Sequence, residues 1–358
     1  MRQDETRFRD GKIVRGEDPL NLEMPFSSLD QVITPTEAFY VRTHFPIPKI
    51  DKRDWRLRIE GEVEKPFELG YEDLLRMQSR TIAVTLECAG NNRNFLEPKV
   101  KGVQWGLGAV GTAEWTGVPL SILLDRAEVK PEAREVILEG ADGGALEEPK
   151  RPSGKVQFVR SIPLAKARTD VLLAYQMNGN DLPPQHGFPL RAIVPGWYAM
   201  ASIKWLQRII VTDRPFSGYY QTLDYAFWKR RGDIAELAPL TEMQIKAEIA
   251  RPAEGEIVPA NSNMRVHGAA WTSDGEITRV ELSTDGGANW KEASLIDQAI
   301  PNAWRLWEFK WHTPSKPGKQ TLIARATDSR GRTQPVEHDP DRGTYMINHL
   351  LPIEVEVK

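Results

Sequence analysis

The pattern of apolar residues changes near residue 240, and this change constrains the fold more than any other feature of the chain. Before it, strand-like and helix-like stretches are mixed: Trp55–Glu60 alternates apolar and polar residues like a half-buried strand, and Tyr71–Met77 has helical spacing. After it, helical periodicity disappears, and about seven short alternating runs are separated by turn signals such as Lys316-Pro317-Gly318. We therefore expect an α+β domain over residues 1–243 and a β-sandwich resembling the immunoglobulin fold over residues 244–358.

Composition narrows the class of partner. The 358 residues are 40% hydrophobic, which is enough to bury the cores of two domains. The 47 basic and 50 acidic residues give a net charge of −3, so the charge gives no reason to expect nucleic acid or an anionic membrane as partner. No apolar run approaches the roughly 18 residues of a membrane span. Residues 1–23 are charged throughout and contain no signal-peptide core, so we expect a cytoplasmic protein.

The chain has a single cysteine, Cys88. One thiol excludes intrachain disulfides, zinc or iron–sulfur sites held by several cysteines, and a covalent c-type haem. The six histidines lie far apart and none forms a His-Glu-x-x-His zinc pattern. Any redox chemistry therefore has to use one thiol together with an organic cofactor.

Cys88 follows a strand-like run, Thr81–Cys88, in which Ile82, Val84, Leu86 and Cys88 share one face. Gly90 and two asparagines end the strand, and Arg93 follows five residues after the cysteine. A nearby cation favours the thiolate, which is a soft metal ligand. The alternative is that Cys88 is a small buried hydrophobic residue, the commoner role of a lone cysteine.

Arginines form a second group of candidates. Arg42 and His44 lie two residues apart, on one face if the segment is extended. Arg305 shares strand parity with Trp307 and Trp311, so it needs an anionic partner because an unpaired buried charge is costly. That partner is either an internal carboxylate or a bound anion, and the residues alone leave both open.

A third group lies between Gln185 and Trp205. His186, Arg191 and Lys204 supply hydrogen-bond donors suited to a phosphate, on loops fixed by glycine and proline. The segment has neither a phosphate-binding Gly-x-x-x-x-Gly-Lys-Ser/Thr loop nor a Rossmann glycine pattern. Tyr225 by itself reads as an ordinary packed aromatic residue.

Taken together and in order, these segments resemble the sulfite oxidase family of molybdopterin-dependent oxidoreductases, in particular its haem-free, plant-type members. The resemblance covers nearly the whole chain and rests on Phe39–His44, Cys88–Arg93, Val103–Trp105, His186–Arg191, Lys204–Leu206, Asp285–Trp290 and Trp304–Trp307.

The resemblance implies a molybdopterin domain followed by an immunoglobulin-like domain that forms a homodimer contact. It implies that Cys88 is the protein ligand to molybdenum. The residues that would hold the cofactor are Tyr40, Arg42, His44, Asp142, His186, Arg191, Ser202, Ile203 and Lys204. Those that would surround the substrate, besides Cys88, are Arg42, Arg93, Trp105, Tyr225 and Arg305.

The implied reaction is oxidation of sulfite to sulfate, because guanidinium groups can grip a small oxyanion and the cofactor supplies oxygen transfer. The electron acceptor would be oxygen or a separate redox carrier. One alternative is a molybdopterin enzyme for another oxyanion or a sulfoxide, as in nitrate reductases; another is a non-catalytic interaction protein. Asn92, and the bulky run Gly196–Met200 that includes Trp197, depart from the family pattern and are expected to reshape the pocket rim.

Overall fold

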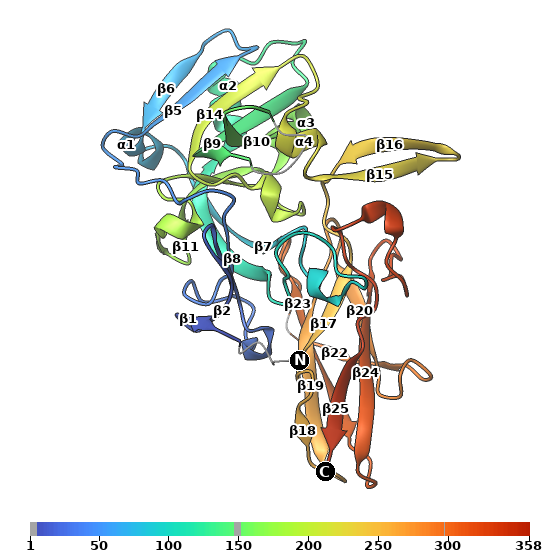
Figure 1. Cartoon of the computed structure of the whole chain (residues 1–358). Helices are drawn as coiled ribbons and strands as arrows, with labels where there is room; N and C mark the ends of the chain where they lie inside the picture. The colour runs from blue at the N-terminus through green and yellow to red at the C-terminus, as the bar shows by residue number, and fades with distance from the viewer. Residues whose placement is uncertain (1–5, 147–151, 297) are drawn as a thin grey trace.

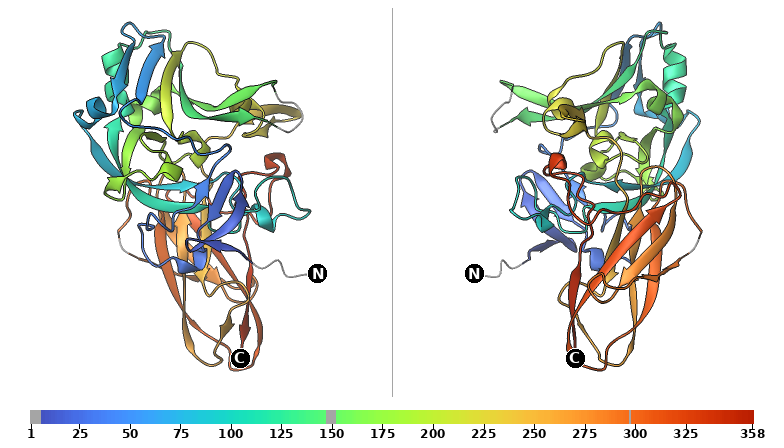
Figure 2. Two further views of the ribbon diagram at one scale, coloured as in Figure 1. Left: turned by 60° about the vertical axis from the view of Figure 1, so that its left-hand side comes forward. Right: turned by 90° about the vertical axis from the view of Figure 1, so that its right-hand side faces the viewer.

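The computed structural model describes residues 6–146, 152–296 and 298–358. The chain forms two lobes, and the second is an elongated sandwich that carries the C-terminus at its far end (Figure 1). Figure 2 shows in both of its views that the N-terminal strands lie near the junction between the lobes.

The first lobe contains three sheets, in which only β14 and β5 pair in parallel. A four-stranded sheet has the order β1 (Phe8–Arg9), β2 (Lys12–Glu17), β3 (Leu20–Glu23) and β4 (Val41–Arg42). A five-stranded sheet has the order β10 (Lys155–Pro163), β9 (Glu135–Ala145), β14 (Leu206–Thr212), β5 (Arg56–Gly61) and β6 (Phe67–Gly70). The third has the order β12 (Asn180–Asp181), β11 (Leu172–Met177), β8 (Val110–Pro119) and β7 (Arg80–Glu87), with β13 (Arg191–Ile193) also paired to β11.

Helices are few and short, so the first lobe is more strand-rich than the expected mixture. The α-helices of the described residues are α1 (Tyr71–Leu75), α2 (Leu120–Ala127), α3 (Leu164–Thr169) and α4 (Tyr219–Thr222). Single 3-10 turns form at η1 (Phe26–Ser28), η2 (Arg93–Phe95), η3 (Pro184–His186), η4 (Ala199–Ala201) and η5 (Pro340–Arg342). Residues 71–77 have helical spacing, but the helix there, α1, is little more than one turn long. Only Tyr71 and Leu74 of this helix are buried, so little packing is available to stabilise a longer one.

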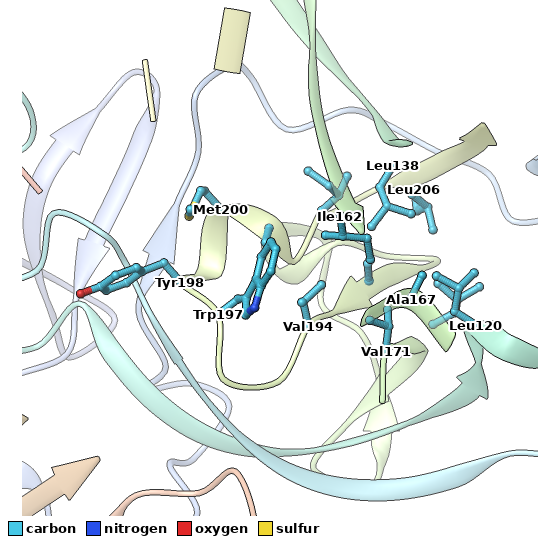
Figure 3. Packing of buried hydrophobic residues seen from close by; sticks show 14 of the residues in the cluster. Leu120, Leu138, Ile162, Ala167, Val171, Val194, Trp197, Tyr198, Met200 and Leu206 are labelled. Atoms are coloured by element: carbon cyan, nitrogen blue, oxygen red, sulfur yellow. The ribbon is translucent and has the colours of Figure 1, made fainter. Parts of the chain in front are cut away.

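Alternating strand residues build the core of the first lobe. In β9, every second residue from Val136 to Asp142 is buried. Figure 3 shows Leu138 and Leu206 from neighbouring strands near Leu120 of α2 and Ala167 of α3. The short helices α2 and α3 therefore cover the five-stranded sheet and bury their apolar residues against it.

The second lobe is a two-sheet β-sandwich, as expected, while its likeness to the immunoglobulin fold stays a prediction. One sheet has the order β17 (Lys246–Arg251), β19 (Asn263–Trp271), β23 (Arg305–His312) and β22 (Ser294–Leu295). The other has the order β18 (Ile257–Val258), β25 (Ile353–Val357), β24 (Gly318–Asp328), β20 (Ile277–Ser283) and β21 (Lys291–Glu292). A hairpin of β15 (Ala226–Arg231) and β16 (Ile234–Pro239) projects from the first lobe. The expected boundary at residue 243 stays a prediction.

Candidate active site

Cys88 stands immediately after β7, where the strand reaches the middle of the molecule. Val84, Leu86 and Cys88 belong to one buried cluster, in agreement with the expected common face. The Cys88 amide donates to the carbonyl of Ala109, at a distance of 2.9 Å. The strand pairing thus fixes the backbone of the cysteine, whose residue is 7% exposed and lines two adjoining cavities.

The turn after Cys88 is shaped around Arg93. A Cβ atom added to Gly90 would lie 2.1 Å from Nη2 of Arg93, and one added to Gly102 would lie 2.6 Å from Nη1. Only residues without a side chain leave room for the guanidinium there. Asn92 has a φ of 72°, a left-handed conformation that asparagine tolerates better than most residues. The Cys-Ala-Gly-Asn-Asn-Arg segment is therefore a compact turn that brings the arginine back beside the cysteine.

The inner cavity is lined by all of the residues expected to hold a cofactor. The expected residues that line it are Tyr40, Arg42, His44, Cys88, Asp142, His186, Arg191, Ser202, Ile203, Lys204 and Tyr225. They come from β4 and the residues beside it, the residue after β7, β9, η3, β13, the loop between η4 and β14, and the residue before β15. The fold thus gathers segments that are far apart in sequence.

Two polar atoms in this cavity have no partner among the described residues. Nε2 of His186 and Oδ1 of Asp142 are both buried and make no hydrogen bond. Buried polar atoms are almost always satisfied, so these two fit a ligand that carries both donors and acceptors. A pterin ring has this chemistry, and the site passes this test for the expected cofactor.

The cavity also concentrates positive charge. Burial lowers the pKa of Arg191 to about 10. Burial, followed by the charge of Arg191, lowers the pKa of Lys204 to about 7. Lys204 donates to the carbonyl oxygens of Arg42 and Gln185, each at 2.9 Å. Burial thus destabilises the charged forms of both side chains, and a bound phosphate group would stabilise them.

Four residues line both the inner cavity and an outer one: Arg42, His44, Cys88 and Tyr225. The Tyr225 hydroxyl is hydrogen-bonded to Nε2 of His44 at 2.6 Å, and the His44 ring stacks on Phe158. Burial, then the charges of Arg42 and Lys204, holds the pKa of His44 well below 6.5, so this histidine is neutral and can accept that hydrogen bond. Burial raises the pKa of Tyr225, which keeps its hydroxyl protonated. The junction is therefore a fixed arrangement around the Cys88 thiol.

The outer cavity, about 1710 Å³ counting the part open to solvent, contains Arg93 together with residues that the sequence did not suggest. Arg93 donates from Nε to Oγ1 of Thr344 at 2.6 Å, and its guanidinium lies 5.2 Å from the ring centroid of Tyr345. The Tyr345 hydroxyl donates to Oδ1 of Asp224 at 3.2 Å. Burial raises the pKa of Asp224. Asp224 could have been suspected from its position beside Tyr225, whereas Thr344 and Tyr345 carry no local signal.

Two expected site residues lie outside both cavities. Arg305 shares its strand face with Trp307 as expected, but its Nε donates to the carbonyl of Ile296, and it lines neither cavity. The second lobe reaches the outer cavity with Thr344 and Tyr345 instead. Trp105 is fully buried behind the site, with its ring edge-on to Tyr40, and supports the wall from behind.

The expected changes to the pocket rim are found only in part. The Asn92 side chain lines neither cavity and donates to Glu248 of the second lobe at 2.5 Å. Trp197 belongs to the hydrophobic core, as Figure 3 shows, while Ala199 and Met200 are the members of its run that line the inner cavity. Asn92 and Trp197 therefore affect packing, whereas Ala199 and Met200 contribute to the pocket surface.

Within the described ranges, no group of three or more histidine, cysteine, aspartate or glutamate residues could hold a metal ion. A site with one thiolate and a cofactor that brings the remaining ligands does not need such a group. In the same part of the chain, no helix is long and apolar enough to cross a membrane.

Comparison with known proteins agrees with this geometry. Residues 44–220 match the oxidoreductase molybdopterin-binding domain, and residues 238–350 match the Mo-co oxidoreductase dimerisation domain. The mitochondrial sulfite oxidase of Rattus norvegicus is 34% identical over 90% of this chain. The chain belongs to the sulfite oxidase family.

The relatives that match this chain do not all carry out the same reaction. The match spans 61% of the length of the rat enzyme. The NADH nitrate reductase of Solanum lycopersicum is also 34% identical, over 89% of this chain and 38% of its own length. The sulfane dehydrogenase SoxCD from Paracoccus pantotrophus has the same fold, with a TM-score of 0.80 and 29% identity over 98% of this chain and 86% of its own. The chain thus belongs to a family of molybdopterin-dependent oxidoreductases, and relatives named for different reactions match it over most of its length.

Proposed function

We propose that this chain oxidises sulfite to sulfate at a molybdenum atom bound by Cys88. The observation that carries the proposal is the junction of the two cavities, which Arg42, His44, Cys88 and Tyr225 all line. A metal on the Cys88 sulfur would face the cofactor on one side and an incoming substrate on the other.

The inner cavity would hold the cofactor. His186 and Asp142 would complete their hydrogen bonds with the pterin ring. Arg191 and Lys204 would bind the phosphate, with the backbone around Ser202 and Ile203 closing the cavity. When bound, the cofactor supplies oxygen-atom transfer coupled to a two-electron redox change.

The outer cavity would bind the substrate. Arg42 and Arg93 line it, and their guanidinium groups together would attract a small oxyanion. Tyr225 stays protonated and is held by His44, so its hydroxyl is a fixed group at the reacting position. Substrate binding thus depends on two arginines and one tyrosine of the first lobe.

A second candidate is a reaction of another sulfur compound or oxyanion. Asp224 and Tyr345 make the outer cavity less cationic than a cavity lined with arginine alone, which would favour a substrate of lower negative charge. The nitrate reductase and sulfane dehydrogenase relatives carry the same two-domain architecture. A non-catalytic interaction protein would have no use for unpaired polar atoms in a buried cavity.

The test is reduction of ferricyanide by protein purified from a host that makes molybdopterin. Sulfite is added first, and thiosulfate follows in a parallel reaction. Nitrate and dimethyl sulfoxide accept electrons, so they are tested separately by the oxidation of reduced methyl viologen. We expect turnover with sulfite in the parent protein and none in Cys88→Ser, with molybdenum content measured in both. If protein that contains molybdenum does not turn over sulfite, the assignment as a sulfite-oxidising enzyme is contradicted. Activity with one of the other compounds would identify the alternative substrate.

We further propose that the protein is a cytoplasmic homodimer and passes its electrons to oxygen or to a separate carrier. The dimerisation domain supports the dimer. Oxygen uptake compared with reduction of an added carrier protein distinguishes the two acceptors.

A further inference from the structure

The second lobe contacts the segment that carries the cysteine at several residues on both sides of Cys88. Glu87, which precedes Cys88, accepts a hydrogen bond from Nζ of Lys246 at 2.6 Å and another from Nε1 of Trp271 at 2.9 Å. Both donors belong to the β17–β19 sheet of the sandwich. The carboxylate beside the metal ligand is thus bound by two groups from the other lobe.

The contacts continue through the turn. The amide of Met346 donates to the carbonyl of Ala89 at 3.0 Å. Asn92 donates to Glu248 and accepts from Lys246 at 3.2 Å. At the end of the turn, Arg93 donates to Thr344. The first lobe contributes backbone pairing, such as the bond from Cys88 to Ala109, and side-chain bonds of Asn91 and Arg93.

These contacts are buried. Glu87 is 0% exposed, and Lys246 and Trp271 are each 1% exposed. In such surroundings water does not replace a lost hydrogen bond, so each contact restricts the turn strongly. A displacement of the sandwich therefore has to displace the residues on both sides of Cys88.

We propose that the second lobe is a positioning element of the metal site: through Trp271, Lys246 and the segment from Thr344 to Met346, it sets the direction of the Cys88 sulfur. This role goes beyond a dimer contact, and it rests on the proposed function only in taking Cys88 as the metal ligand. The two tryptophans of the lobe interface provide a matched test.

Trp271 and Trp304 are both buried residues of the second lobe that donate their indole hydrogen to the first lobe. Trp271 bonds Glu87, whereas Trp304 bonds the carbonyl of Val32 at 2.8 Å, away from the cysteine turn. Replacing each by phenylalanine removes one hydrogen bond between the lobes and keeps an aromatic ring. Because Cys88 is the only cysteine, alkylation of the protein at a thiol reports on this site alone.

The measurement is the rate at which iodoacetamide alkylates Cys88 in cofactor-free protein, together with the melting temperature. We expect Trp271→Phe to raise the rate about fivefold, the factor that one lost hydrogen bond would give, and Trp304→Phe to leave it within about twofold. Both variants should melt a few degrees lower, by about 2–4 °C. Equal rates in the two variants, or an unchanged rate in Trp271→Phe, would overturn the proposal and leave the interface a purely stabilising role.

A second pair keeps the test available if Trp271→Phe does not fold. Thr344→Val removes the hydroxyl that Arg93 binds, and Thr344→Ser retains it. Faster alkylation in the valine variant alone supports positioning, and equal rates in both contradict it. Since these assays use no cofactor and no substrate, a failure of the sulfite assay does not affect them.

Discussion

Asp224 and Tyr345 place a carboxyl group and a neutral phenol beside the two arginines of the outer cavity. The carboxyl lies close enough to Arg42 and Arg93 for their charges to lower its pKa, although burial has the larger effect and raises it. Charges this close in a partly buried site interact strongly, so Asp224 offsets part of the attraction that the arginines exert on an anion.

The variant Asp224→Asn should therefore bind sulfite more tightly. Asparagine keeps an acceptor for the Tyr345 hydroxyl and removes the negative charge. We expect the KM for sulfite to fall about threefold with little change in kcat, because the change in interaction is on the order of 1 kcal/mol. Steady-state kinetics check this, with Asp233→Asn on the exposed hairpin as control. A higher KM would mean that the carboxylate assists the substrate.

At the scale of elements, the turn from Cys88 to Arg93 depends on a glycine that leaves space for a side chain of the same turn. We expect Gly90→Ala to lower the free energy of unfolding by about 2 kcal/mol, since the added Cβ would overlap the Arg93 guanidinium. Chemical denaturation measures the loss. In the double variant Gly90→Ala/Arg93→Met the steric part should disappear, and losses that simply add would contradict the overlap.

Strand β17 contributes a titratable group to the lobe interface. Burial raises the pKa of Glu248 to about 7, well above the 4.5 of an exposed glutamate. Between these two pH values the folded protein holds a proton that the unfolded chain releases, so this group adds stability as the pH falls from 8 to 5.

Glu248→Gln should remove this contribution. We expect the parent protein to gain about 2 kcal/mol more than the variant over that pH range. Denaturation at pH 8 and pH 5 gives both values, and effects from other titrating groups cancel between the two proteins. Glu292→Gln on the exposed strand β21 should follow the parent protein. A Glu248→Gln variant that shows the same pH dependence as the parent would rule out the raised pKa.

At the scale of the whole molecule, the active site needs both lobes. The first lobe carries the inner cavity, and the second adds Thr344 and Tyr345 to the outer cavity and holds the turn around Cys88. The lobe that matches the dimerisation domain therefore also forms part of the site.

We expect two copies to associate in solution. Sedimentation equilibrium should give about 81 kDa, twice the 40.5 kDa of one chain. A mass near 40.5 kDa at micromolar concentration would contradict the dimer and would show that the second lobe acts only within its own chain.

Through its resemblance to a known family, the sequence indicated the cofactor class, and it named the residues that line the inner cavity. Motifs such as Cys88–Arg93 and His186–Arg191 are local, since strand alternation, glycine and the order of polar residues fix where each side chain points. The change of pattern near residue 240 likewise indicated the second, all-β lobe.

The residues that the second lobe brings to the site follow from the packing of the two lobes and not from any local motif. Arg305 has the sequence context of an anion-binding residue, yet its strand places it outside both cavities, and the loop with Thr344 and Tyr345 lies beside Arg93. Asn92 lies in the cysteine motif, yet it faces Glu248. Contacts between lobes depend on how two rigid sheets pack, and no local pattern of residues encodes that arrangement.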